Sequence, residues 1–253
     1  MELFLLCCFA LVAGFIDAIA GGGGLILLPA HFILMPAFSV SELLGTNKFA
    51  GSSGTLMSTI QYLRKVKAEW KLILPSLIIA CIAAVSGARM VSFFHKEDIA
   101  PVVVVLLVIM LVHTLTNKTR GLIDEREKVS PRKVAWLLPV SAAFIGFYDG
   151  FFGPGAGSLL MFVFISFLKF DFLSAAAHTK IFNCITNVGA LVFFIISKNV
   201  HYDVAIPVAL CNMTGSYIGV KMALKKGSRL IRFIYIMMVI LLIAKIAYDY
   251  ILK

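Results

Sequence analysis

Long runs of apolar residues, separated by short polar stretches, make up most of the chain. In the first half the runs cover 2–20, 25–40, 43–63, 72–93 and 99–116, and in the second half 134–152, 157–168, 174–196, 204–224 and 230–252. A helix of about 20 apolar residues can cross the hydrocarbon core of a membrane. The pattern therefore predicts an all-α membrane protein, with a single transmembrane domain over 1–253.

The first two runs of each half have an unusual shape. Residues 2–40 are too long for one crossing, while 25–40 alone is short for one. The glycines at 21–24 divide the two runs, and glycines at 153–157 divide the corresponding runs of the second half. Such a pattern predicts a broken-helix, re-entrant-like hairpin with its glycine tip inside the bilayer. Backbone freed there must be buried in protein or line a cavity.

The chain contains the same glycine signature twice. The segment that begins with Gly14 returns, without a gap, 132 positions later at Gly146. The same offset pairs Leu27 with Leu159, Lys48 with Lys180, Pro75 with Pro207 and Gly87 with Gly219. A period this long in two apolar halves predicts a duplicated membrane transporter. Repeat one covers 1–116, and repeat two covers 134–253.

The basic loops predict how the repeats are oriented. Residues 64–71 contain four Lys or Arg, 117–133 contain six and 221–232 contain five, whereas 35–45 contain none. The basic loop thus follows the third apolar run in the first half but the fourth in the second. If basic loops face the cytoplasm, the halves are inverted repeats, each a hairpin plus three transmembrane helices. Both termini then lie outside, and 117–133 is a cytoplasmic linker.

Composition excludes several other classes of protein. Sixty per cent of the residues are hydrophobic and only 14% are charged, so we expect no soluble domain. The net charge of +10 comes from loops between apolar runs, so it does not indicate a nucleic-acid partner. The five cysteines lie in apolar runs without metal-site spacing. We expect no metal, no cofactor and no catalytic residue. Glu2, with no preceding Lys or Arg, argues against a signal peptide.

The glycine tips are the first candidate for a binding site. A helix that restarts after such a tip offers unpaired N–H groups and a positive dipole end to an anion. The alternative is that the glycines serve close helix packing. The tip positions expected to bind substrate are Gly22, Gly23, Gly24, Gly155, Ala156 and Gly157.

Two lysines at matching positions form the second candidate. A lysine within a membrane is costly and usually faces a cavity or a partner. Lys48 and Lys180 could hold an oxyanion, although snorkelling toward the headgroups is the alternative. The polar residues expected to assist them are Thr46, Asn47, His178, Thr179, Asn183 and Asn187.

Two aspartates also match between the halves. Asp17 and Asp149 lie just before the glycine tips. A carboxylate in such a helix could accept a coupling proton, or neutralise Lys48 and Lys180 when no substrate is bound. A third possibility is a structural role, in which the carboxylate caps the broken backbone.

These motifs resemble the sulfite exporter TauE/SafE family, also called the TSUP permeases. The resemblance rests on Gly14 to Leu25 with Pro29, on Gly45 to Lys48, and on their second-half counterparts, Gly146 to Ser158 and Ala177 to Lys180 with Asn183 and Asn187. It implies a multi-pass permease of the bacterial inner membrane for a small anion, mostly a sulfur oxyanion or organosulfonate.

We therefore predict a secondary transporter that works by alternating access around a midplane site between the repeats. The alternative is an uncoupled anion channel for small oxyanions. A membrane-embedded enzyme is disfavoured, because no nucleophile–base constellation is present in the sequence. The expected partners are a small anionic substrate, the lipid bilayer and a second copy of the chain in a possible homodimer.

Overall fold

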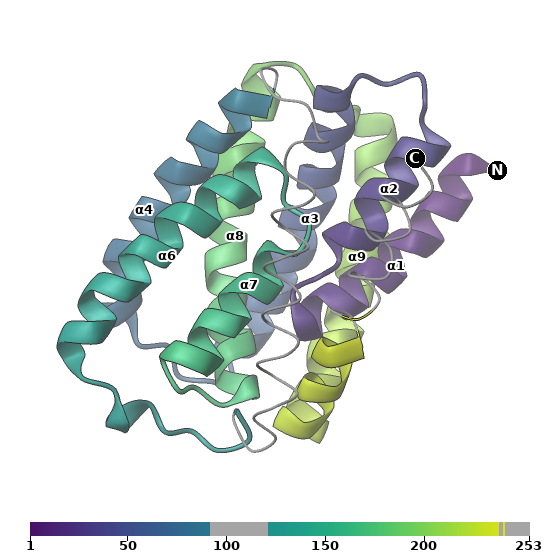
Figure 1. The fold of residues 1–253 in the computed structure, drawn as a ribbon. Helices are drawn as coiled ribbons and strands as arrows, with labels where there is room; N and C mark the ends of the chain where they lie inside the picture. The colour runs from purple at the N-terminus through teal and green to yellow at the C-terminus, as the bar shows by residue number, and fades with distance from the viewer. Residues whose placement is uncertain (92–120, 238–239, 241–253) are drawn as a thin grey trace.

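A computed structural model describes residues 1–91, 121–237 and 240, and its regular structure there is entirely helical (Figure 1). The first half comprises α1 (Glu2–Ala20), α2 (Gly24–Leu34), α3 (Val40–Leu63) and α4 (Trp70–Met90). The second comprises α6 (Pro131–Phe151), α7 (Ala156–Phe162) with a π-helical turn (Val163–Phe167), α8 (Phe172–Ile196) and α9 (Tyr202–Lys226). Residues 126–128 form a 3₁₀ turn, and 228–237 are helical. The predicted run 99–116 and the end of 230–252 lie outside the described residues.

Local signals explain where the long helices begin. The hydroxyl of Ser39 accepts from the backbone N–H of Glu42, whose carboxylate accepts in return from the N–H of Ser39, so a complete capping box starts α3. Asp171 caps α8 through its carboxylate. Ser130 caps α6, and Pro131 occupies its first turn. These caps satisfy N–H groups that a helix start leaves without an intrahelical partner.

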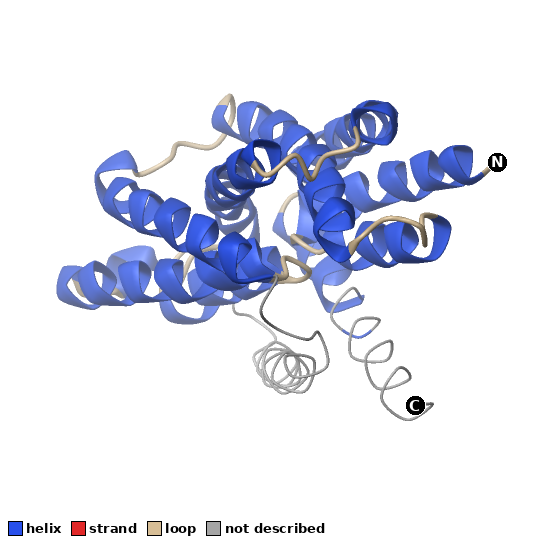
Figure 2. Ribbon diagram, turned by 90° about the horizontal axis from the view of Figure 1, so that it is seen from above, coloured by secondary structure: helices blue, strands red, loops and turns tan. Residues whose placement is uncertain are grey.

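The described helices confirm the prediction of an all-α membrane protein. Four of them, α1, α4, α6 and α8, are long and apolar enough to cross a membrane. The helices α2 and α7 are the short second arms of the two hairpins. α3 and α9 are as long as α8 but more polar, and α3 packs against both α8 and α9. Figure 2 shows this layout, in which helices and loops make up the whole described part.

Equivalent helices of the two halves make equivalent contacts. α1 packs along α9, and its counterpart α6 packs along α4, the counterpart of α9. Gly14 lies against the backbone of Asn212, and Gly146, 132 positions later, lies against the backbone of Ala80. The central helices α3 and α8 run antiparallel: Gly45, near the start of α3, lies against the loop after α8, whereas Thr59 bonds Lys180 near the start of α8.

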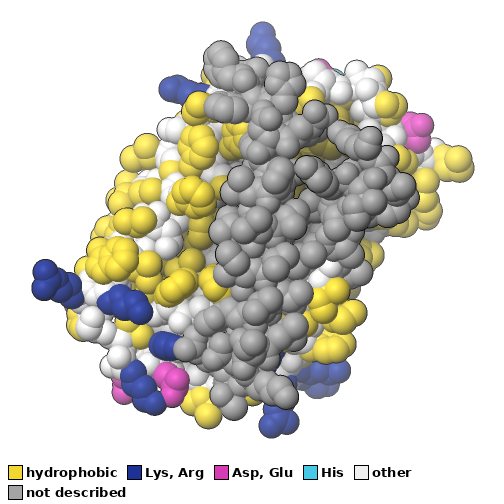
Figure 3. Space-filling view, viewed as in Figure 1, with side chains coloured by type: hydrophobic (Ala, Val, Ile, Leu, Met, Phe, Trp, Pro, Cys, Tyr) yellow, Lys and Arg dark blue, Asp and Glu magenta, His cyan; other side chains and the backbone are white. Residues whose placement is uncertain are grey.

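The basic stretches gather at one end of the bundle, which we call the linker end. Arg126 of the linker pairs with Glu69 between α3 and α4. Ser228, just after α9, bonds Asp171 at the start of α8. The segments 64–71, 121–133 and 221–232 therefore lie together, at the lower end in Figure 1. On the face shown in Figure 3, apolar side chains cover the flank, and most lysines and arginines lie toward that lower end.

Candidate functional site

The two glycine breaks meet at the centre of the molecule. Gly21 ends α1 in the left-handed conformation, with φ of 75°. A Cβ atom added there would lie 2.5 Å from the carbonyl carbon of Gly157, in the first turn of α7. A Cβ added at Gly24 would lie 3.4 Å from the Cα of Pro154. Glycine is required at position 21 for both its backbone conformation and its close approach, so the break in one half is built against the break in the other.

Side-chain hydroxyls near the breaks satisfy the backbone groups that the breaks release. The hydroxyl of Tyr62 donates to the carbonyl of Ala18 at 3.0 Å, and Ser158 donates to the carbonyl of Ala20 at 3.0 Å. In the second half, the hydroxyl of Tyr148 donates to the carbonyl of Pro154 at 2.6 Å. Unpaired backbone groups at membrane depth each cost several kcal/mol, so these hydrogen bonds allow helices to end there.

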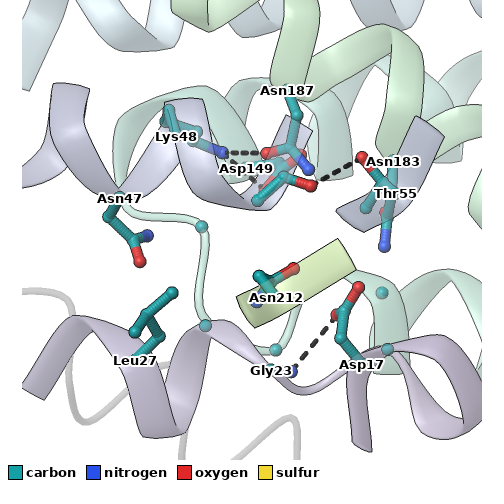
Figure 4. Close-up of a pocket in the computed structure, with 16 residues that line it drawn as sticks. Asp17, Gly23, Leu27, Asn47, Lys48, Thr55, Asp149, Asn183, Asn187 and Asn212 are labelled. Atoms are coloured by element: carbon teal, nitrogen blue, oxygen red, sulfur yellow. Dashed lines mark hydrogen bonds and ion pairs between the residues drawn. The ribbon is translucent and has the colours of Figure 1, made fainter. Parts of the chain in front are cut away.

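A cavity of about 50 Å³ lies between the breaks and α3, α8 and α9 (Figure 4). Its volume suits a few water molecules or a small ion. The lining residues are Asp17, Gly21, Gly23, Gly24, Leu27, Asn47, Lys48, Gly51, Thr55, Asp149, Gly153, Gly155, Gly157, Asn183, Asn187 and Asn212. Apart from Leu27, they are glycines and polar or charged residues, in a bundle that is otherwise mostly apolar inside.

Two ion pairs cross between the halves at this cavity. The Nζ of Lys48 lies 2.9 Å from Oδ1 of Asp149, and the Nζ of Lys180 lies 2.7 Å from Oδ2 of Asp17. The pairs are reciprocal, because each lysine binds the aspartate of the other repeat. Lys48 is 4% exposed and Lys180 is fully buried. Both ammonium groups point into the protein, so neither lysine snorkels to the headgroups in this structure.

Further hydrogen bonds hold the charged groups in place. Lys48 also donates to Oδ1 of Asn187 at 2.8 Å, and the hydroxyl of Thr186 donates to Asp149. Asp17 accepts from the backbone N–H of Gly23 at 3.2 Å, at the start of α2 (Figure 4). Asp17 thus neutralises a lysine and caps a broken helix at once, which combines two of the roles considered for it.

The structure brings most of the predicted site residues together and separates others. Asp17, Gly23, Gly24, Asn47, Lys48, Asp149, Gly155, Gly157, Asn183 and Asn187 line the cavity. Gly22, Thr46, Ala156, His178, Thr179 and Lys180 lie outside its lining, although Lys180 reaches Asp17. Thr46 and His178 instead bond the N-termini of α9 and α4, respectively.

Sequence reasoning missed several residues of the site. Gly51 and Thr55 lie one and two turns after Lys48, on the face of α3 that borders the cavity. Asn212 reaches the cavity from α9, and its repeat counterpart is Ala80. The repeat match therefore gave no indication of Asn212. Its signal was that of a single amide within an apolar run, where polar groups are costly.

The cavity is electrically balanced. Lys48 and both aspartates line it, Lys180 reaches Asp17 from outside the lining, and the four formal charges cancel in the crossed ion pairs. Charges interact strongly in a low-dielectric interior, so an anion that arrives must displace a carboxylate from an ammonium group or bring a compensating positive charge.

Comparison with known proteins identifies relatives over almost the full chain. The family description "Sulfite exporter TauE/SafE" matches residues 6–246. A "Probable membrane transporter protein ORF9" of Sinorhizobium sp is 33% identical over 95% of this chain and 90% of its own. A "Probable membrane transporter protein" of Haemophilus influenzae is 32% identical over 98% and 95%, respectively. The Escherichia coli K12 "Probable membrane transporter protein YfcA" is 29% identical over 95% and 87%.

No solved structure matches the chain. The relatives are named as membrane transporters and not as enzymes, and this agrees with the transporter predicted from the repeat and the broken helices. The match covers both halves, with their apolar helices and both glycine motifs. This chain therefore belongs to the sulfite exporter TauE/SafE family and is a multi-pass membrane transporter.

Proposed function

We propose that the chain is a permease for a small anion, a sulfur oxyanion or an organosulfonate, that alternates access to the cavity between the two repeats. The observation behind this proposal is the pair of buried lysines at the cavity, each held by an aspartate of the other repeat. The sulfur class rests on the family description, and the cavity volume is consistent with a small ion. We also propose that the protein resides in the bacterial inner membrane and assembles there as a homodimer.

The crossed pairs offer a mechanism for reversible binding. An arriving anion competes with Asp149 for Lys48, or with Asp17 for Lys180. A carboxylate displaced from its lysine leaves an uncompensated negative charge in the protein interior, which is costly. One proton taken up per displaced aspartate would keep the cavity balanced, so we propose proton-coupled transport. The N–H of Gly23, now bonded to Asp17, becomes free to contact the anion.

The antiparallel arrangement of α3 and α8 supports inverted repeats. These two helices carry the equivalent residues Lys48 and Lys180, so they correspond in the two halves. A two-fold axis that exchanges two antiparallel helices must lie perpendicular to them. For helices that cross a membrane, such an axis lies in the membrane plane, which is the symmetry of inverted-repeat transporters. Exchange of conformations between the two repeats then opens the site alternately to the two sides.

Flux into liposomes tests the proposal. We expect purified protein to take up sulfite or a small sulfonate with saturation and with faster uptake under an imposed proton gradient. Lys48→Met and Lys180→Met should each reduce uptake at least tenfold, since each loses a charge-assisted contact of roughly 1.5–3 kcal/mol. Lys225→Met, which alters an exposed lysine at the end of α9, is the control. Flux that does not saturate and ignores the proton gradient would establish the channel instead, and uptake unchanged in both lysine variants would refute the proposed site.

A further inference from the structure

Two sets of contacts outside the cavity join helices at the opposite ends of the bundle. At the end away from the linker, the backbone N–H of His201 donates to the hydroxyl of Thr46 at 3.2 Å. The Nε2 of His201 lies 2.9 Å from a carboxylate oxygen of Glu42. The ring of Phe38 stacks on the His201 ring, with centroids 3.9 Å apart. These four residues, Phe38, Glu42, Thr46 and His201, form what we call the His201 gate.

The linker end has a matching set of contacts. The backbone N–H of Glu69 donates to Nε2 of His178 at 3.4 Å. The carboxylate of Glu69 pairs with Arg126. The ring of Phe170 lies 4.8 Å from the His178 ring, and the Arg126 guanidinium lies 4.6 Å from the centre of the Phe170 ring. Glu69, Arg126, Phe170 and His178 form what we call the linker gate.

The repeat offset of 132 residues relates the two gates. It pairs Phe38 with Phe170, Thr46 with His178 and Glu69 with His201. In each gate, the N-cap residue of α4 or α9 donates its N–H to a side chain in the first two turns of α3 or α8. In each, a phenylalanine just before that helix packs against a histidine ring. The residue types differ between the two halves, but the contacts occupy equivalent positions in the two repeats.

The gates stand on either side of the cavity. The two central helices run antiparallel, so Thr46 and His178 lie at opposite ends of their contact. Lys48 and Thr55 of α3, and Asn183 and Asn187 of α8, line the cavity between them. Each gate joins a central helix to the loop ahead of α4 or α9. It therefore links the elements that would have to separate to open that end.

We infer that the His201 gate and the linker gate are the two alternately opened closures of the transport pathway, each controlling access from its own side. This inference rests on the alternating access proposed above. When the contacts at one end break, the cavity opens there, while the equivalent contacts at the other end hold the protein closed. Both sets of contacts are formed in the structure. Thr46 and His178, which the sequence predicted to be substrate ligands, thus control access to the cavity in this proposal.

Side-specific labelling of a cavity cysteine tests the gates. Thr55→Cys places a thiol in the cavity lining, in a protein whose native cysteines have been replaced. A membrane-impermeant maleimide is applied to right-side-out and to inside-out vesicles. Phe38→Ala and His201→Ala should raise the labelling rate roughly two- to tenfold from one side only, which corresponds to loss of one such contact. Arg126→Gln and Phe170→Ala should raise it by a similar factor from the opposite side only.

Matched controls separate gating from general loosening. Asp203→Asn lies two residues after His201, and Lys128→Gln lies two residues after Arg126, and both are exposed side chains outside the gates. Both should leave labelling unchanged. Gate variants that raise labelling equally from both sides, or from neither, would overturn the inference. Side-specific labelling without any anion flux would keep the gates and reject the proposed substrate, whereas anion flux with unaltered labelling would reject the gates alone.

Discussion

At the scale of single residues, the crossed ion pairs decide the character of the site. Removing an ion from water into a protein interior costs several kcal/mol, which a well-placed partner offsets. Lys48 and Asp149 are each at least nine-tenths buried, so loss of either partner leaves a charge that is largely shielded from bulk water. The groups that we propose to bind an anion therefore neutralise each other in this structure.

The Lys48–Asp149 pair predicts strong coupling between two mutations. Lys48→Met leaves an unpaired buried carboxylate, and Asp149→Asn leaves an unpaired buried ammonium, so each should destabilise the protein by about 3–5 kcal/mol. The double variant removes both charges and should cost less than either single change. A double-mutant cycle on unfolding in detergent, with Lys225→Met as a control for lysine loss, measures the coupling. Additive effects would mean that the two charges do not depend on each other.

At the scale of helices, close packing depends on particular glycines. A Cβ at Gly215 of α9 would lie 1.9 Å from the carbonyl oxygen of Leu11 in α1. A contact of the same kind joins α4 and α6, where a Cβ at Gly87 would lie 2.1 Å from the carbonyl oxygen of Phe147. Helices without a water-driven hydrophobic force between them associate through such close backbone approach.

Replacing two glycines of the long helices by alanine should change the stability of the protein in different ways. Gly215→Ala must push α1 from α9 and should cost about 1–3 kcal/mol, as overpacking does. Gly51→Ala meets only Nδ2 of Asn187 at 3.9 Å, so it should be neutral or stabilise α3 by up to about 1 kcal/mol through helix propensity. Thermal unfolding of both variants in the same detergent makes the comparison. Equal loss in both would show that packing against α1 is not what requires glycine.

At the scale of the whole molecule, basic segments from both repeats lie at the same end of the helix bundle. The segments 64–71, 121–133 and 221–232 share the linker end, while the loop between α8 and α9 lies at the other. Positive charge near the ends of membrane helices favours the cytoplasmic side. We propose on this basis that the linker end is cytoplasmic.

Cysteine labelling in intact cells checks this topology. Lys67→Cys and Lys225→Cys, both exposed at the linker end, should resist an impermeant reagent until the cells are permeabilised. Lys198→Cys, exposed in the loop after α8, should react at once. Tolerance of each change is shown by retained anion flux in liposomes. Labelling of positions 67 and 225 from opposite faces would exclude inverted repeats.

The sequence alone determined the helices, their breaks and the residues shared by the two halves, because apolar runs, glycine clusters and a repeat offset can all be read from the order of residues along the chain. Lys48, Asp149 and the glycine tips were found in this way. Only the tertiary structure decided that each lysine pairs with the aspartate of the other repeat, that Tyr62 satisfies a carbonyl freed at the end of α1, and that His178 accepts a hydrogen bond from the backbone of Glu69. These contacts join residues at least 44 positions apart. Which partners meet depends on how the helices pack, because a buried charge or carbonyl pairs with whichever complementary group the packing brings within reach.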